Sequence, residues 1–598
     1  MSKRIKWLLA TAGVLALLAL AAPWSLGDFV LRNEIAHRLQ ERTGLQTSVE
    51  GRIVLTLAPR PALKLEGVSL RDNSGALDVQ TGVLRAQLRL LPLIAGRIEF
   101  TSLDLSGATI SLTEPDDQRA AAIMARAAES PPLTEPPGRI SLGNSTIRLV
   151  AGSRSAELFT QVDGAIEWPA AGSPATVSVA GRWRSEPFDL AMWVGDPSAM
   201  MRREASPLTL KLDSRTATAS LNGRLELGLR PQFEGKAAVS IASLGEALIL
   251  AGLDVHLPIP IRKISATGVL KATAQSMSLS DARISSDGNS YEGSVVLAGR
   301  DARPMLSGTL ATDQLQLAPL LAGLPSLVAP DQSWSRDTLP KPVAHQLDLD
   351  LRLSASRARY GRIQVQDAGF VVKASEGQID VSLIDSRSYG GRLKGRLVAA
   401  ARPAGLGLKL TAGFTGVDAG AIAADLMRDK RIAGSATGQA SLEAIGDCAD
   451  ELVQSLEGRI DATIENGDFI GIDLDQALRR NEKRPLSVPA EVRRGRTSFA
   501  KAQFAARIKD GVVEFDDAAA TGFSLSTHVS GALRLPDRSL TMRLTASQTN
   551  IDGSPKPDAP SLSLEIAGSW DDPRLDFDFD SLIRRSNAAA PLLRAVQP

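Results

Sequence analysis

A few residues of this sequence have the types and spacing that acyl-transfer chemistry requires. Ser498 and Lys501 match Ser-x-x-Lys, in which the serine is the nucleophile and the lysine a base. The companion patterns Ser-Asp-Asn and Lys-Thr-Gly are absent from the chain, so two ordinary strand residues are the favoured interpretation. The Gly-rich phosphate loop, the zinc-protease pattern and the Gly-x-Ser-x-Gly elbow are absent as well. We therefore expect no catalytic residue and no enzyme activity.

Alternating carboxylates form the second candidate, a cation site. Asp576, Asp578 and Asp580 fall on one face of a strand, and Ca²⁺ takes several carboxylate oxygens as ligands. An EF-hand loop needs Gly at its sixth position, where this chain has Ser581, so a solvated strand face is favoured. The four histidines lie far apart, and Cys448 is the only cysteine. We expect no metal, no cofactor and no disulfide within the chain.

The N-terminus has the pattern of a membrane anchor. Lys3, Arg4 and Lys6 precede an uncharged run, residues 7–26, with a tryptophan at each end. About 20 apolar residues are enough to cross a bilayer, and a basic flank favours the cytoplasmic side. A cleaved signal peptide is the alternative, and it exports the body as well. We expect a retained single-pass helix, with the N-terminus cytoplasmic and the body across the membrane.

The body has the two-residue period of β-strands. Residues 84–90, 208–212 and 347–353 alternate between apolar and polar side chains, and many further runs do the same. The Asn-Gly or Asp-Gly pairs at 163, 222, 287, 466 and 510 have the composition of tight hairpin turns. Short helices are expected at 28–43, 116–129, 243–252, 314–323, 419–430, 447–456 and 473–483. The formal net charge of +1, from 68 basic and 67 acidic residues, argues against a general nucleic-acid binder.

A sheet with one apolar face has to bury that face away from water, and the expected helices are too few to cover it. Several closed sandwiches or barrels would bury it internally. Alternatively, one long sheet curls into a trough that an apolar ligand fills, and lipid acyl chains are the obvious candidate. The pattern alone leaves both solutions open and favours the sandwiches.

Particular segments resemble the AsmA family of bacterial envelope proteins. The resemblance begins with the anchor, a helix that ends at Thr43-Gly44, the strand at residues 51–53, and the segments 59–70 and 90–98. A second resemblance covers residues 450–458 and 466–474, and residues 568–573 are similar to the closing strand of the family. The middle, residues 140–420, is similar only in the general character of its sequence and not in particular motifs.

The resemblance implies a mainly β fold: an N-terminal transmembrane helix, then a long curled antiparallel sheet that forms a β-groove, with a few short helices. It implies anchoring in the bacterial inner membrane, a periplasmic body, and a role in outer-membrane homeostasis through movement of phospholipid between the membranes. Membrane lipids are then the expected partners, with outer-membrane or periplasmic proteins besides. The expected divisions are 1–27 (anchor), 28–112 (first helix and first strands of the groove), 113–137 (helix and Pro-rich linker), 138–324 (middle of the groove), 325–342 (Pro-rich loop), 343–582 (C-terminal AsmA-like β region with helices) and 583–598 (tail).

Apolar residues of the first strands are the candidates for lipid contact, and an ordinary packed core is the alternative for the same residues. The strand register is needed to decide which side chains share a face. An assembly factor that binds strands of outer-membrane proteins at a sheet edge is the second functional hypothesis. The candidate groove-lining residues are Leu63, Leu65, Leu88, Leu90, Ile98, Phe100, Leu103, Leu105, Ile110 and Leu112.

Overall fold

A computed structural model gives the positions of most of the chain. It describes residues 24–26, 29–57, 60–72, 77–94, 98–113, 136, 138–151, 154–228, 231–250, 262–300, 303–342, 347–426, 431–481, 495–522, 524–550, 556 and 561–577. These residues are mainly β, with a few short helices. They divide into two compact units: unit 1 is residues 1–254 with 262–284, and unit 2 is residues 255–261 with 285–598.

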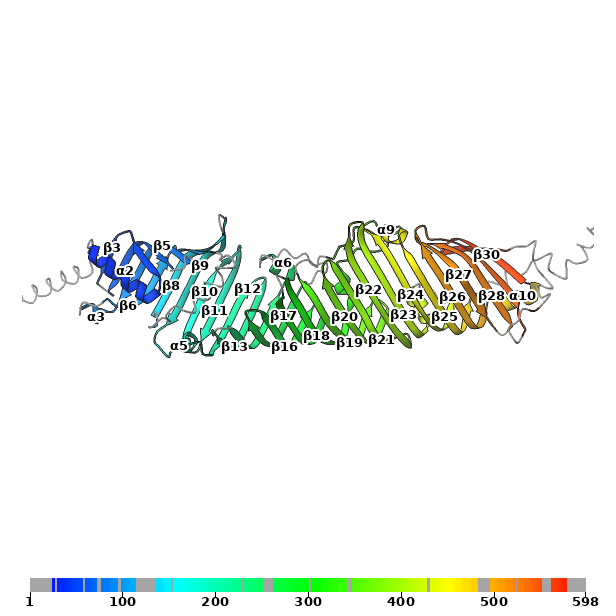
Figure 1. Cartoon of the computed structure of the whole chain (residues 1–598), viewed down its shortest axis with the longest axis horizontal. Coiled ribbons are helices and arrows are strands. Elements are labelled where there is room, and N and C mark those ends of the chain that lie inside the picture. The colour runs from blue at the N-terminus through cyan, green and yellow to red at the C-terminus, as the bar shows by residue number, and fades with distance from the viewer. Residues whose placement is uncertain are drawn as a thin grey trace, which may run out of the picture. The chain divides into compact units, whose positions relative to one another are not determined.

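Unit 1 contains the N-terminal strands and helices (Figure 1). Its last strand, β16, ends two residues beyond the unit. The elements are β1 (Trp24–Leu26), α2 (Phe29–Thr43), β2 (Gln46–Val49), β3 (Ile53–Thr56), β4 (Ala62–Arg71), β5 (Leu77–Leu88), α3 (Leu90–Ile94), β6 (Phe100–Ser106), β7 (Thr109–Thr113), β8 (Gly138–Ala151), β9 (Arg154–Trp168), β10 (Ala175–Trp183), β11 (Glu186–Val194), α5 (Pro197–Met201), β12 (Ser206–Ser214), β13 (Ala217–Glu226), β14 (Gln232–Ile241), α6 (Leu244–Leu250), β15 (Ile264–Thr273) and β16 (Ser276–Ser286).

Unit 2 consists of long strands and four short helices in its described residues. The elements are β17 (Asn289–Arg300), β18 (Arg303–Gln316), α7 (Leu317–Leu321), β19 (Asp348–Tyr360), β20 (Ile363–Ser375), β21 (Gln378–Ser388), β22 (Gly391–Arg402), β23 (Gly405–Asp418), α8 (Ala419–Leu426), β24 (Ile432–Gly446), α9 (Ala449–Gln454), β25 (Glu457–Ile470), α10 (Leu474–Asn481), β26 (Arg496–Lys509), β27 (Val512–Thr521), β28 (Leu525–Arg534), β29 (Ser539–Gln548), β30 (Ser561–Ser569) and β31 (Asp572–Phe577).

The pairing is mixed rather than purely antiparallel, which corrects the expected fold. Most strands pair antiparallel with the next strand in sequence, as in the run from β8 to β15 and the run from β19 to β31. However, β8 pairs in parallel with β6 and β7, and β19 pairs in parallel with β18. A parallel neighbour needs a long crossover, and residues 114–137 and 317–347 are the two long connections that precede these strands.

Helix α2 forms because its apolar positions face the sheet. Ile35 and Leu39 are four residues apart, so they lie on one side of the helix, and both are fully buried. They pack against the inward side chains of β3–β6, which makes this end of unit 1 a closed hydrophobic core. Gly44, at φ +72°, ends the helix in the left-handed conformation that glycine adopts at little cost.

The sequence predicted most of the described helices. Helices α2, α6, α7, α8, α9 and α10 lie within the expected ranges, and the helix expected at 116–129 lies outside the described residues. Helices α3 and α5 were missed. A cap signal did exist for α5, because Pro197 occupies its first turn and the Asp196 carboxylate accepts a hydrogen bond from the Ala199 amide at 2.9 Å.

Only two of the five hairpin signals are hairpin turns. Asp287-Gly288 joins β16 to β17 and Asp510-Gly511 joins β26 to β27, each with positive φ at both residues. The pairs at 163, 222 and 466 lie inside strands, so the predicted turns there are wrong. Gly223 shows the reason: it lies directly opposite Gly235, and a Cβ there would collide with the Glu234 carbonyl oxygen. The glycine permits close strand approach rather than a turn.

The expected membrane anchor falls mostly outside the described residues, which omit 1–23 and 27–28. The three described residues of the apolar run, Trp24–Leu26, form β1 and pair with β3. Within the described part of the chain, no helix combines the length and apolar character that a membrane span requires.

Candidate functional site: a charge-free apolar face

Rows of apolar residues cross the strands of unit 1 on one face. Each row joins residues that are direct partners in the register of neighbouring strands, so their side chains share a face. One row begins with Leu55, Leu63, Ala86 and Leu103 in β3–β6 and continues from β8 to β15. We call the second part the unit 1 row: Ile140, Ile166, Val177, Met192, Leu210, Leu221, Ala237 and Gly268.

Unit 2 carries an equivalent row without interruption from β17 to β30. Every member is apolar or glycine, and none carries a charge. We call it the unit 2 row: Val295, Gly308, Leu351, Val372, Val381, Leu397, Leu410, Leu442, Gly458, Ile508, Val513, Leu533, Leu540 and Gly568.

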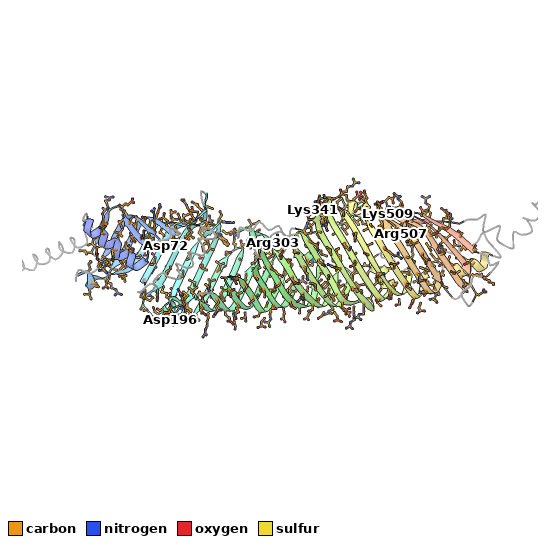
Figure 2. All side chains as sticks on the ribbon, in the orientation of Figure 1. Asp72, Asp196, Arg303, Lys341, Arg507 and Lys509 are labelled. Atoms are coloured by element: carbon orange, nitrogen blue, oxygen red, sulfur yellow. The ribbon has the colours of Figure 1, made fainter. Side chains whose placement is uncertain are left out.

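The opposite face of unit 2 is polar and carries cross-strand ion pairs. Lys409 Nζ lies 2.6 Å from Glu443 Oε1, directly across the β23–β24 pair. Arg396 Nη2 donates a hydrogen bond of 2.6 Å to Asp380 Oδ2, and this bond lowers the pKa of the Asp380 carboxyl. Arg507, labelled in Figure 2, pairs with Asp516 at 3.0 Å. The charge separation between the two faces follows from the two-residue period.

Part of the apolar face is open to solvent. Leu397 and Leu410 are direct partners in the β22–β23 pair, and they are 40% and 37% exposed. Ile166 in the unit 1 row is 42% exposed. Large aliphatic side chains in a charge-free row are ordinarily covered in a soluble protein, so this surface has the character of a binding face for an apolar ligand.

The N-terminal part of the face is closed, and most of the predicted site residues lie there. The structure brings them together in the core beneath α2, so they also satisfy the alternative of an ordinary packed core, and lipid contact at these positions stays a prediction. Leu63 and Leu65 in β4, Leu88 at the end of β5, and Phe100, Leu103 and Leu105 in β6 are buried in this core; Ile98 and Ile110 pack against it; Leu90, expected in a strand, begins α3, and it and Leu112 in β7 are exposed.

Short helices border the open part of the face instead of crossing it. In unit 1, Met200 and Met201 of α5 pack beside Val194 and Leu208 at one margin. In unit 2, α8 packs on Ala436 and Ile464, while α9 closes the margin beside Leu406. Figure 1 shows α5 and α9 at the strand ends rather than over the strand centres. No helix among the described residues therefore covers the middle of either row.

The connection between β18 and β19 extends along the same margin of unit 2. We call residues 325–342 the strap. Its Leu339 packs with α9, and Lys341 Nζ lies 3.0 Å from Asp447 Oδ1 at the margin seen in Figure 2. Its Trp334 donates a hydrogen bond of 2.8 Å to the Leu535 carbonyl, in the β28–β29 turn, and the Arg538 guanidinium lies 4.7 Å from the same ring. The strap thus ties the strand ends to one another.

An apolar hollow lies under α10 at the end of the unit 2 face. Its volume is about 230 Å³, and Leu474 of α10 forms part of its wall. It is large enough for a short stretch of hydrocarbon, since a cavity of about 150 Å³ accepts benzene. The other lining residues include Phe469, Phe504, Phe515, Val529, Met542 and Leu544.

Among the described residues, the members of these catalytic and metal-binding patterns make separate contacts. Ser498 donates a hydrogen bond to Asp468 at 2.5 Å, and Lys501 lies opposite Glu465 in the register. Cys448 is buried at the start of α9. Asp576 lies in β31, whereas Asp578 and Asp580 lie outside the described residues.

Tyr389 is expected to make unit 2 less stable at alkaline pH. Burial, and then the hydrogen bond of 3.1 Å that its hydroxyl donates to Asp425 of α8, raise the pKa of Tyr389 to about 12. The fold therefore favours the neutral phenol. This contribution is complete below the unfolded pKa near 10 and is lost as pH rises towards 12. Hydrogen exchange of α8 amides should accelerate over this window, after correction for intrinsic rates.

Tyr389→Phe is the matched control, because it removes the ionising group and keeps the ring. Its α8 exchange should depend less on pH between 10 and 12 than that of the wild type. An equal dependence in both proteins would contradict the role of Tyr389.

Sequence reasoning had found the strands of the face but not its open part. The alternation at residues 347–353 is visible in the sequence, yet no sequence pattern places α2 over the apolar face of unit 1 or leaves Leu397 and Leu410 of unit 2 accessible. A family model described as the AsmA family matches residues 1–130 and 263–518, which is more than half of the chain and includes parts of both units. A search of curated proteins found no match.

Proposed function

The chain belongs to the AsmA family, and from this premise we propose that it is an inner-membrane-anchored periplasmic protein that carries phospholipid between the inner and outer membranes. The observation that supports this most directly is the charge-free row with exposed Leu397 and Leu410 at its centre. Acyl chains lie on this face, and the head groups stay in water at the open side. The transfer is not catalytic, and its direction comes from other components.

The size of the unit 2 face suits several lipids at once. At about 4.8 Å per strand, the strands β17–β31 cover roughly 65 Å along the row. One leaflet of hydrocarbon is about 15 Å thick, half of a bilayer core. The row is therefore several acyl chains long, which favours a path for lipid over a single binding pocket.

The anchor is supported by the sequence. Residues 7–26 carry no charge, and three basic residues precede them. This pattern favours a cytoplasmic N-terminus, with the sheet on the periplasmic side.

Photocrosslinking in cells tests the function. A photoreactive amino acid at Leu410 should form lipid-sized adducts, whereas the same probe at Thr411, which lies next to it on the polar face, should not. Adducts with unfolded outer-membrane proteins and no lipid at either position would favour the assembly-factor hypothesis instead. Equal lipid adducts at both positions would show that the apolar face is not the binding surface.

A further inference from the structure

The most exposed large apolar side chain among the described residues lies in α3, which is not part of the unit 1 row or the unit 2 row. Leu91 is 80% exposed and Leu90 is 53% exposed. The next turn of α3 is fixed, because Leu93 packs against the core under α2 and its amide donates a hydrogen bond of 3.2 Å to the Arg89 carbonyl. Two leucines are thus held outward by a helix that the core positions.

Strand pairing places α3 at the same end of the strands as Trp24, the first described residue of the chain. Helix α3 joins the end of β5 to the start of β6, and Leu88 pairs with Phe100. The β3–β4 turn lies at this end too, because Thr56 pairs with Ala62, and Leu88 donates to the Pro61 carbonyl. Trp24 pairs with Leu55, so residue 24 enters the sheet at this end. The chain therefore enters the sheet beside α3 at Trp24, and the uncharged residues 7–23 precede it directly in the sequence.

Charge at this end suits lipid head groups. Arg60 in the β3–β4 turn is exposed, and the Arg89 side chain is 63% exposed although it lies 3.5 Å from Glu99. Arginine side chains beside exposed leucines place cations at the phosphate level while the leucines enter the hydrocarbon boundary. A water-soluble partner protein would explain the leucines but not their position beside the apolar run.

We propose that Leu90 and Leu91 of α3 insert into the head-group boundary of the bilayer that holds residues 7–23. The sheet then has two attachments to one membrane, and this end of the apolar face is held at the membrane surface. The inference goes beyond the lipid path, and it rests on the anchored state of the proposed function.

Depth-dependent quenching tests the insertion. The full chain, with Cys448→Ala, is reconstituted into vesicles of equal parts phosphatidylethanolamine and phosphatidylglycerol, and an environment-sensitive fluorophore is attached at Leu91→Cys. Nitroxide lipid labelled near the head group should quench it several-fold more than the same fluorophore at Ser106→Cys, which is exposed at the opposite end of β6. Leu90→Cys provides a second position in case the first variant disturbs α3.

Quenching at positions 90 and 91 no stronger than at position 106 would overturn the proposal, and so would failure of the chain to float with the vesicles. The crosslinking test of Leu410 keeps the two ideas apart. Lipid adducts at Leu410, together with no enhanced quenching at positions 90 and 91, would reject only the insertion of α3. An inserted α3 with no adducts at Leu410 would reject the lipid path alone.

Discussion

Leu410→Asp is expected to reduce lipid retention and lipid transfer by at least about tenfold, because an ionised carboxylate in an apolar row has to be dehydrated wherever an acyl chain covers it. Leu410 lies between Leu397 and Leu442 in the register, so the charge would interrupt the unit 2 row near its middle. Because Leu410 is 37% exposed, the new carboxylate remains hydrated in the empty protein and the fold should survive. Lipid that copurifies with the chain and transfer between vesicles are the two readouts.

Thr411→Asp is the matched control. Thr411 is the next residue of β23, faces the polar side, and lies opposite Arg396 and Ser441. The same charge is thus added beside a cation, and lipid retention should stay at the wild-type level. Equal losses in both variants would point to damage of the strand, and normal transfer by a folded Leu410→Asp protein would remove this residue from the path.

The faces of the strands were predictable from the sequence, but the closure of the apolar face was not. Alternation at residues 347–353 correctly indicates that Leu349, Leu351 and Leu353 share a face, since strand geometry requires it. Whether that face is covered depends on where helices and long connections lie. Ile35 and Leu39 show a helix with an apolar side, yet the spacing that predicts α2 says nothing about the strands it covers.

The errors have two physical causes. Asn222-Gly223 has turn composition, but Gly223 is required for contact with Gly235 inside a strand pair, and sequence alone does not separate these two uses of glycine. The parallel pairs arise where long connections return the chain to the same edge, as between β18 and β19. The strap in this connection contacts the β28–β29 turn, about 200 residues away in sequence, and no local pattern encodes that.

Leu65→Ala is expected to destabilise the N-terminal core by about 2–5 kcal/mol, whereas Leu410→Ala should cost less than about 1 kcal/mol. Leu65 pairs with Ile53 and Leu84 in the register of β3–β5, Leu410 belongs to the unit 2 row, and both truncations remove the same atoms. Leu65 is 0% exposed beneath α2, so its truncation leaves a cavity; Leu410 is 37% exposed, so water or lipid fills the space. The comparison tests whether the apolar face of unit 1 is closed beneath α2 while the apolar face of unit 2 is open at Leu410.

Hydrogen exchange measures the two sites separately in one intact chain. Amides of β4 and β5 should exchange at least about 30-fold faster in Leu65→Ala. The reason is that the free energy of local opening falls by the core stabilisation that the truncation removes. Amides of β22 and β23 should change little in Leu410→Ala. Similar small effects at both sites would mean that α2 does not seal the core, so that Leu63, Leu65 and Leu105 become candidates for lipid contact on the same footing as Leu410.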